Sequence, residues 1–177
     1  MKKQILTLIL ASTVIHAQVA EPKNPVAGDD KAPAAGKLED ISAQPIPDKP
    51  AAGKVHGRAF KVEKATLKQG RLDLWQGGGT APHLEKFGIQ ISQKKDENLS
   101  GQTFTVKLTE DTGIIVILSY SGENGEPMGN RFFMGEQYTM KLEFGTAKEG
   151  KIPGKIHLRL LDEAGSFVVG TFEAEIK

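Results

Sequence analysis

The side chains in this chain with the greatest capacity for chemistry are histidines, serines and carboxylates, and their spacing defines no catalytic motif. Beyond residues 1–20 the chain has three histidines, His56, His83 and His157, which lie far apart and in no metal-ligand arrangement. His56 and His157 occupy polar positions of alternating segments, so we expect them at the surface. The chain has no cysteine, and no serine stands in a Gly-x-Ser-x-Gly motif. The sequence therefore predicts no metal site and identifies no nucleophile.

Two other motifs match functional sites only in residue type. Gly77-Gly78-Gly79 lacks both the Lys-Ser/Thr pair and the helix that a phosphate-binding loop needs. Glu110-Asp111 and Asp162-Glu163 are pairs of carboxylates such as glycoside cleavage uses. Both pairs stand in expected turns, where acidic residues are common because turns are wet. We predict that the chain is not an enzyme and that it carries no cofactor.

Aromatic residues give the best indication of a binding surface. Trp75 is the only tryptophan and stands at a strand end beside the glycine-rich loop. Tyr120 and Phe133 flank the polar loop 121–130, and Phe133 is expected to fill the core. Exposed aromatic side chains on a β-scaffold stack on sugar rings or anchor protein partners. The alternative for Trp75 is a place in the core. The predicted binding residues are Trp75, Gly78, Tyr120 and Asn124.

The elements that must position these residues are β-strands. In residues 151–177, apolar and polar residues alternate over two runs, which predicts an antiparallel hairpin with one buried face. A three-residue loop, Glu163-Ala164-Gly165, would place Gly165 in the left-handed conformation that such loops need. In that register Leu160 faces Val168, and Lys155 faces Glu173.

Two further segments lead to specific expectations. Ile114–Leu118 is unbroken apolar and mostly β-branched, which is typical of a strand covered on both faces. We expect it to be the central strand. The apolar parity changes near Ala59–Phe60, which predicts a β-bulge.

The fold class follows from the number of such segments. No window shows a sustained period of 3.6 residues, and Gly-rich turns recur throughout residues 54–177. Eight or nine short antiparallel strands predict an all-β fold, a two-sheet β-sandwich of immunoglobulin-like or jelly-roll type. A small β-barrel is the alternative.

Composition divides the chain into three parts. Residues 1–20 have two lysines, a short apolar run and small residues at the end, which predicts a secretory signal peptide. Residues 21–53 hold six of the nine prolines and no aromatic residue, so we expect a disordered linker. Residues 54–177 form the predicted β-sandwich domain. Its 17 basic and 16 acidic residues give no bias toward nucleic acid.

These observations favour an exported, non-catalytic β-sandwich binding module of a bacterial-type cell envelope or secretome, periplasmic or secreted. Its expected partner is an envelope protein or a glycan, and no membrane segment is expected after signal cleavage. The alternatives are a hydrolytic enzyme whose site forms only in the fold, and a structural envelope protein without a separate activity.

Overall fold

The computed structural model describes residues 38–77, 85–91, 98–122, 124–133 and 137–177. All of them belong to one compact unit, Lys31–Lys177. Within these ranges the chain consists of strands and turns, and no helix there could span a membrane. The predicted signal peptide and residues 21–37 of the predicted linker lie outside the described residues.

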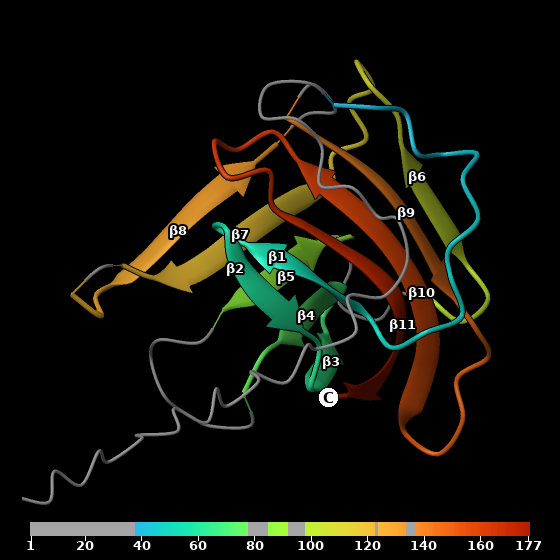
Figure 1. Cartoon of the computed structure of the whole chain (residues 1–177). Coiled ribbons are helices and arrows are strands. Elements are labelled where there is room, and N and C mark those ends of the chain that lie inside the picture. Colours follow the sequence, from blue (N-terminus) through green and yellow to red (C-terminus); the bar gives the residue numbers. More distant parts are fainter. Residues whose placement is uncertain (1–37, 78–84, 92–97, 123, 134–136) are drawn as a thin grey trace, which may run out of the picture. The chain divides into compact units, whose positions relative to one another are not determined.

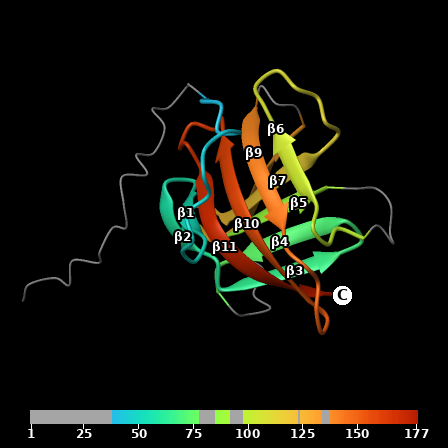
Figure 2. The same cartoon turned by 90° about the vertical axis from the view of Figure 1, so that its right-hand side faces the viewer.

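Eleven strands in the described ranges form one curled, open sheet that resembles half a barrel (Figure 1). Nine of them follow the path β6-β9-β10-β11-β3-β4-β5-β7-β8, and the β1–β2 hairpin joins at β11. Figure 2 shows β6, β9, β10 and β11 side by side. The strands are β1 Ala52–Val55, β2 Arg58–Lys61, β3 Lys64–Lys68, β4 Arg71–Trp75, β5 Lys86–Gln90, β6 Thr103–Val106, β7 Ile115–Ser121, β8 Pro127–Phe132, β9 Tyr138–Phe144, β10 Lys151–Leu160 and β11 Phe167–Ile176.

The all-β class is confirmed, and the two-sheet sandwich is not. The described strands belong to a single sheet that curls around the core, with β6 and β8 at its two ends. One pairing is also parallel, between β11 and β3, whereas we expected antiparallel strands throughout. The alternation of apolar residues indicates strands but does not encode this long-range pairing, which decides how the sheet curls.

Two-residue turns with positive φ connect several neighbouring strands. His56-Gly57 joins β1 to β2, and Gln69-Gly70 joins β3 to β4. Turns of this hand match the twist of the strands that flank them. The expected bulge near Ala59–Phe60 is therefore wrong, because the change of parity comes from the His56-Gly57 turn between two strands.

The β10–β11 hairpin forms with the predicted faces but in a register shifted by two residues. Leu158 faces Val168, and Gly154 faces Phe172. The Lys155–Glu173 contact is replaced by an ion pair of 2.7 Å between Lys151 and Glu173. The loop is longer than expected, because the Asp162 carboxylate accepts bonds from the Ser166 backbone and hydroxyl and so holds a wider turn. Gly165 has the predicted positive φ, 59°.

The core lies on the concave side of the curled sheet. Val116 and Phe172 belong to it. The segment Ile114–Leu118 is nevertheless not central, since β7 lies next to the end strand β8. Ile115 and Ile117, on its other face, are only half-buried. The unbroken apolar run predicted that both faces of this strand would be buried, whereas the fold buries only one of them fully.

Residues 38–51, which we call the strap, pack on the convex face of β9, β10 and β11. Ile41 is fully buried, and Ile46 clusters with Phe167 and Val169. The strap also bonds to β11, where the Thr171 N–H donates to the Lys49 carbonyl at 2.7 Å. Residues 38–53 therefore have a defined structure, whereas we expected them to belong to a disordered linker. A few spaced apolar residues suffice to anchor this proline-rich segment to the sheet.

The strap also changes the surroundings of His157. This side chain is 4% exposed, and it stands opposite Val169, which clusters with Ile46 of the strap. Arg159 Nε donates a hydrogen bond of 3.2 Å to His157 Nε2. The expectation that His157 lies at the surface is therefore wrong, whereas His56 is exposed as expected.

Candidate functional site

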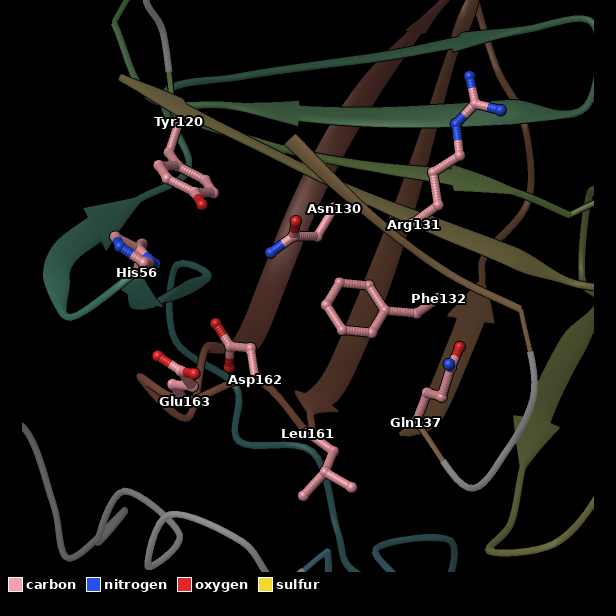
Figure 3. A pocket seen from close by; sticks show the side chains of 9 residues that line it. All are labelled: His56, Tyr120, Asn130, Arg131, Phe132, Gln137, Leu161, Asp162 and Glu163. Carbon is pink, nitrogen blue, oxygen red and sulfur yellow. The ribbon is translucent and has the colours of Figure 1, made fainter. Parts of the chain in front are cut away.

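A cavity of about 510 Å³ opens between β8 and the loop that joins β10 to β11 (Figure 3). It lies where the curled sheet ends, so β8 forms one wall without a further strand beyond it among the described residues. We call it the open-side pocket. Its lining residues combine aromatic, amide, carboxylate and aliphatic groups: His56, Tyr120, Asn130, Arg131, Phe132, Gln137, Leu161, Asp162 and Glu163.

An aromatic pair forms one side of the open-side pocket. The rings of His56 and Tyr120 are stacked, with centroids 4.2 Å apart and planes 10° from parallel. Tyr120 comes from β7 and is buried, whereas His56 stands in the β1–β2 turn and is exposed. The pair therefore offers a flat surface held from behind by the core, on which a planar or apolar group can pack.

A chain of hydrogen bonds joins the two turns that border the pocket. The His56 backbone N–H donates to Ser166 Oγ at 2.9 Å, and the Ser166 hydroxyl donates to Asp162 Oδ2 at 2.6 Å. Asp162 thus ties the β10–β11 loop to the β1–β2 turn. This is a positioning role, and it gives the pocket a wall that is set by the fold.

β8 contributes the opposite wall. Asn130 faces Leu118 and Phe132 faces Val116 in the pairing with β7, so both side chains lie on the concave face. Figure 3 shows the Phe132 ring and the Asn130 amide directed into the pocket. The Arg131 side chain is directed away from it. The inner wall of β8 is therefore one aromatic ring and one amide.

The pocket carries two carboxylates, on Asp162 and Glu163. Neither forms an ion pair within the described part of the chain. The Arg131 guanidinium, which also borders the pocket, is directed away from them (Figure 3). The interior of the pocket is therefore polar and negatively charged on the side of the β10–β11 loop.

Exposed apolar side chains surround this side of the sheet. Leu161 is 42% exposed in the pocket lining, and Met128 on the concave face of β8 is 46% exposed. Phe133, directly after β8, is 48% exposed, so its expected place in the core is wrong. Large apolar side chains that remain in water near one pocket are typical of a binding surface.

Trp75 lies on the other face of the sheet. It pairs with Lys86, which pairs with Ser119, so these three side chains share the convex face. The Lys86 ammonium stands 4.3 Å from the centre of the Trp75 ring. Burial lowers the pKa of Lys86, against the opposing effect of the nearby Asp73 carboxylate. Lys86 Nζ and Asp73 Oδ1 lie 3.7 Å apart.

The predicted binding residues therefore do not form one surface. Tyr120 lines the open-side pocket, but Trp75 belongs to a smaller hollow of about 380 Å³ on the convex face. Asn124 is exposed in the β7–β8 turn, where its N–H donates to Glu126 at 3.0 Å, and it does not line either hollow. Gly78 lies outside the described residues.

Sequence reasoning missed most of the pocket lining. Residues 121–130 were expected to be a loop, although Met128, Asn130 and Phe132 have the spacing of one strand face. That period of two is a weak signal because an asparagine stands in its middle. His56 was expected at the surface, and only the fold shows that it stacks on Tyr120.

The described residues contain no group of three or more histidine and carboxylate side chains that could hold a metal ion. Neither a protein-family model nor a curated protein nor a solved structure matches the chain. Function is therefore inferred from the geometry of the open-side pocket.

Proposed function

We propose that this chain is an exported, non-catalytic binding module whose ligand, an envelope protein or a glycan, occupies the open-side pocket. The observation that carries the proposal is the pocket itself, about 510 Å³ at the free end of the sheet, with a stacked aromatic pair, amides and carboxylates in one lining. Pockets of this size with a few convergent polar groups are typical of ligand sites.

Two features support binding rather than hydrolysis at this place. Both oxygens of Asp162 accept hydrogen bonds from Ser166, so this carboxylate holds the loop. The neighbouring apolar side chains of Leu161 and Met128 are exposed, and they add contact area that a bound partner would cover. The export part of the proposal rests on the signal-like residues 1–20.

The test compares two aspartate variants in the full-length protein. Leu161 in the pocket and Ile176 at the end of β11 are 42% and 45% exposed, so they are matched in size and accessibility. Binding to a native cell-envelope preparation is measured by co-sedimentation. Leu161→Asp should weaken binding by about tenfold or more, as the loss of an interface anchor does. Ile176→Asp should bind like the unchanged protein.

Equal binding by both variants would contradict the proposal. The thermal unfolding midpoints of the two variants serve as the folding control, since surface substitutions of this kind shift stability little.

A further inference from the structure

β8 leaves part of its backbone without a partner strand in the described structure. It pairs with β7 along one side and stands at the end of the strand path. In an antiparallel pair, alternate residues direct their N–H and C=O groups toward the partner strand and away from it. The residues of β8 whose backbone groups point away from β7 are therefore known once the hydrogen-bonded residue pairs between β7 and β8 are known.

The hydrogen bond next to the turn identifies these pairs. The Gly122 N–H donates to the Glu126 carbonyl at 2.8 Å, so this pair is a hydrogen-bonded one. Counting along the register, the residues bonded to β7 are Met128, Asn130 and Phe132. Gly129 and Arg131 then direct their N–H and C=O groups to the free side.

Both ends of this free side are closed. Pro127 has no N–H to offer. Phe133 is the next outward residue, and its N–H donates to Gln137 Oε1 at 2.8 Å. Among the described residues, the free N–H groups of β8 are therefore those of Gly129 and Arg131, beside the open-side pocket that Asn130 and Phe132 line.

We infer that β8 takes an extended segment of a partner protein as an additional strand, with a Lys or Arg side chain of that segment in the open-side pocket. This inference rests on the proposed function and names its ligand class. Main-chain bonds to Gly129 and Arg131 would hold the segment, and pockets for alternate side chains would select it.

The register places the side chains of the incoming strand. Directly opposed residues of neighbouring strands share a face, so the residue opposite Asn130 points into the pocket. There it meets the side of the pocket that carries Asp162 and Glu163, which have no cationic partner among the described side chains. The incoming residues opposite Met128 and Phe132 meet apolar side chains. The expected segment is thus apolar-x-Lys/Arg-x-apolar.

A second copy of this chain fits the pocket less well. If two β8 strands paired around Asn130, this residue would face its own copy, and no cation would enter the pocket. The two carboxylates would then be covered without an opposite charge, which costs free energy. Charge complementarity therefore favours a basic segment of a different protein.

The experiment selects peptides with the full-length protein. A phage-displayed library of random linear twelve-residue peptides is enriched on it, and the affinity of the best synthetic peptide is measured by calorimetry. We expect the selected peptides to share the apolar-x-Lys/Arg-x-apolar pattern. Methylation of alternate backbone nitrogens in the peptide should abolish binding, because strand addition needs these donors.

A matched pair of variants tests the backbone contact. Arg131→Pro removes the outward N–H without removing a bond to β7, and Arg131→Ala keeps that N–H but removes the side chain. Arg131→Pro should weaken peptide binding at least tenfold, and Arg131→Ala less than threefold. Glu163→Gln should weaken it about threefold to tenfold. Unfolding midpoints near that of the unchanged protein show that each variant is folded.

Other outcomes overturn the inference in distinguishable ways. If peptides bind but Arg131→Pro and Arg131→Ala behave alike, strand addition is wrong. If no peptide is enriched while envelope binding still depends on Leu161, the proposed function stands and the extended segment is wrong. If neither kind of binding depends on the pocket, both fail. A dimer that Arg131→Pro dissociates would make a second copy the occupant.

Discussion

The Tyr138 hydroxyl is buried and donates a hydrogen bond of 2.6 Å to the Ile114 carbonyl. Burial is the main cause that raises its pKa from 10.0 to about 12. Below pH 10 the hydroxyl is protonated in both the folded and the unfolded chain, so its contribution to stability is complete. As the pH rises from 10 to about 12, the unfolded chain loses the proton first, and the contribution is lost.

Tyr138→Phe should therefore change how stability depends on alkaline pH. At pH 7 the variant should lose about 0.5–1.5 kcal/mol with the hydrogen bond. Above pH 10 this difference in stability should shrink. Tyr138 of the unchanged protein then ionises more readily in the unfolded chain, which lowers its stability, whereas phenylalanine does not titrate. Urea unfolding of both proteins at several pH values between 7 and 12 measures the difference in their free energies of unfolding. A difference that stays constant over this range would contradict the assignment.

Trp75 gives a second test at the residue scale, because it is the only tryptophan. The Lys86 ammonium lies 4.3 Å from its ring, and the hollow that Trp75 lines carries three cations and one carboxylate, those of Lys68, Arg71, Lys86 and Asp73, a net charge of +2. An anionic quencher should therefore reach Trp75 more readily than a cationic one.

Lys86→Met removes the cation that stands over the Trp75 ring and keeps the length of the side chain. The ratio of iodide to caesium quenching of Trp75 fluorescence, measured at constant ionic strength, should fall about twofold in the variant. An unchanged ratio would mean that Lys86 does not govern the electrostatic surroundings of the indole.

At the scale of elements, the strap makes a clear prediction. Ile41 is fully buried on the convex side, so Ile41→Ala should lower the free energy of unfolding by about 2–5 kcal/mol. Glu39→Ala, at an exposed position of the same segment, should change it by less than about 0.5 kcal/mol. Urea unfolding distinguishes them.

A chain shortened to start at Gly53 extends this test. It should unfold at a clearly lower temperature, because Phe167 and Val169 lose their cover. An unchanged midpoint would show that residues 38–52 contribute nothing to stability.

The close contact between β10 and β11 gives a coupled prediction. A Cβ on Gly154 would clash with Phe172 Cζ and would lie 2.9 Å from the Glu143 carbonyl oxygen. Gly154→Ala should therefore destabilise the hairpin, and Phe172→Ala should cost about 3–5 kcal/mol. The double variant should lose less free energy of unfolding than the two single variants together, because the Cβ at position 154 no longer clashes with the Phe172 ring. Additive changes in the free energy of unfolding would contradict this packing.

Sequence patterns predicted the strands better than their arrangement. The period of two identified both faces of β10 and β11, because the alternating apolar residues pack on the core, except for Ile176, which is exposed at the end of β11. The pairing register depended instead on the Asp162 carboxylate, whose bonds to Ser166 no apolar pattern reveals. Likewise His157 stands at a polar position of the alternation, yet it is buried opposite Val169, which the strap residue Ile46 contacts.

The candidate site was harder to predict for the same reason. Tyr120 was identified, but its stacking partner His56 stands on a turn between two other strands. Trp75 and Tyr120 are both near strand ends, yet the pairing register places them on opposite faces of the sheet. A residue's face follows from its own strand, whereas a site requires the positions of several strands together.

At the scale of the whole described unit, the sheet curls but ends at β6 and β8 (Figure 1). β6 is short, with four residues, whereas β8 has six, of which all except Phe132 are exposed. Proteins usually protect such an edge with proline, charge or a covering segment. Here the edge carries Pro127 and Arg131 but leaves backbone groups beside a pocket. The proposed function assigns this open side to a ligand.

Site-specific photo-crosslinking in the source cells tests that claim most directly. Benzoylphenylalanine replaces Met128 beside the pocket or, as the control, Ile176 at the end of β11, which are 46% and 45% exposed. Irradiation should give a product of defined mass from position 128, identified by mass spectrometry as a protein or a glycan adduct, and none from position 176. The same product from both positions, or a product only from position 176, would contradict binding at the open side.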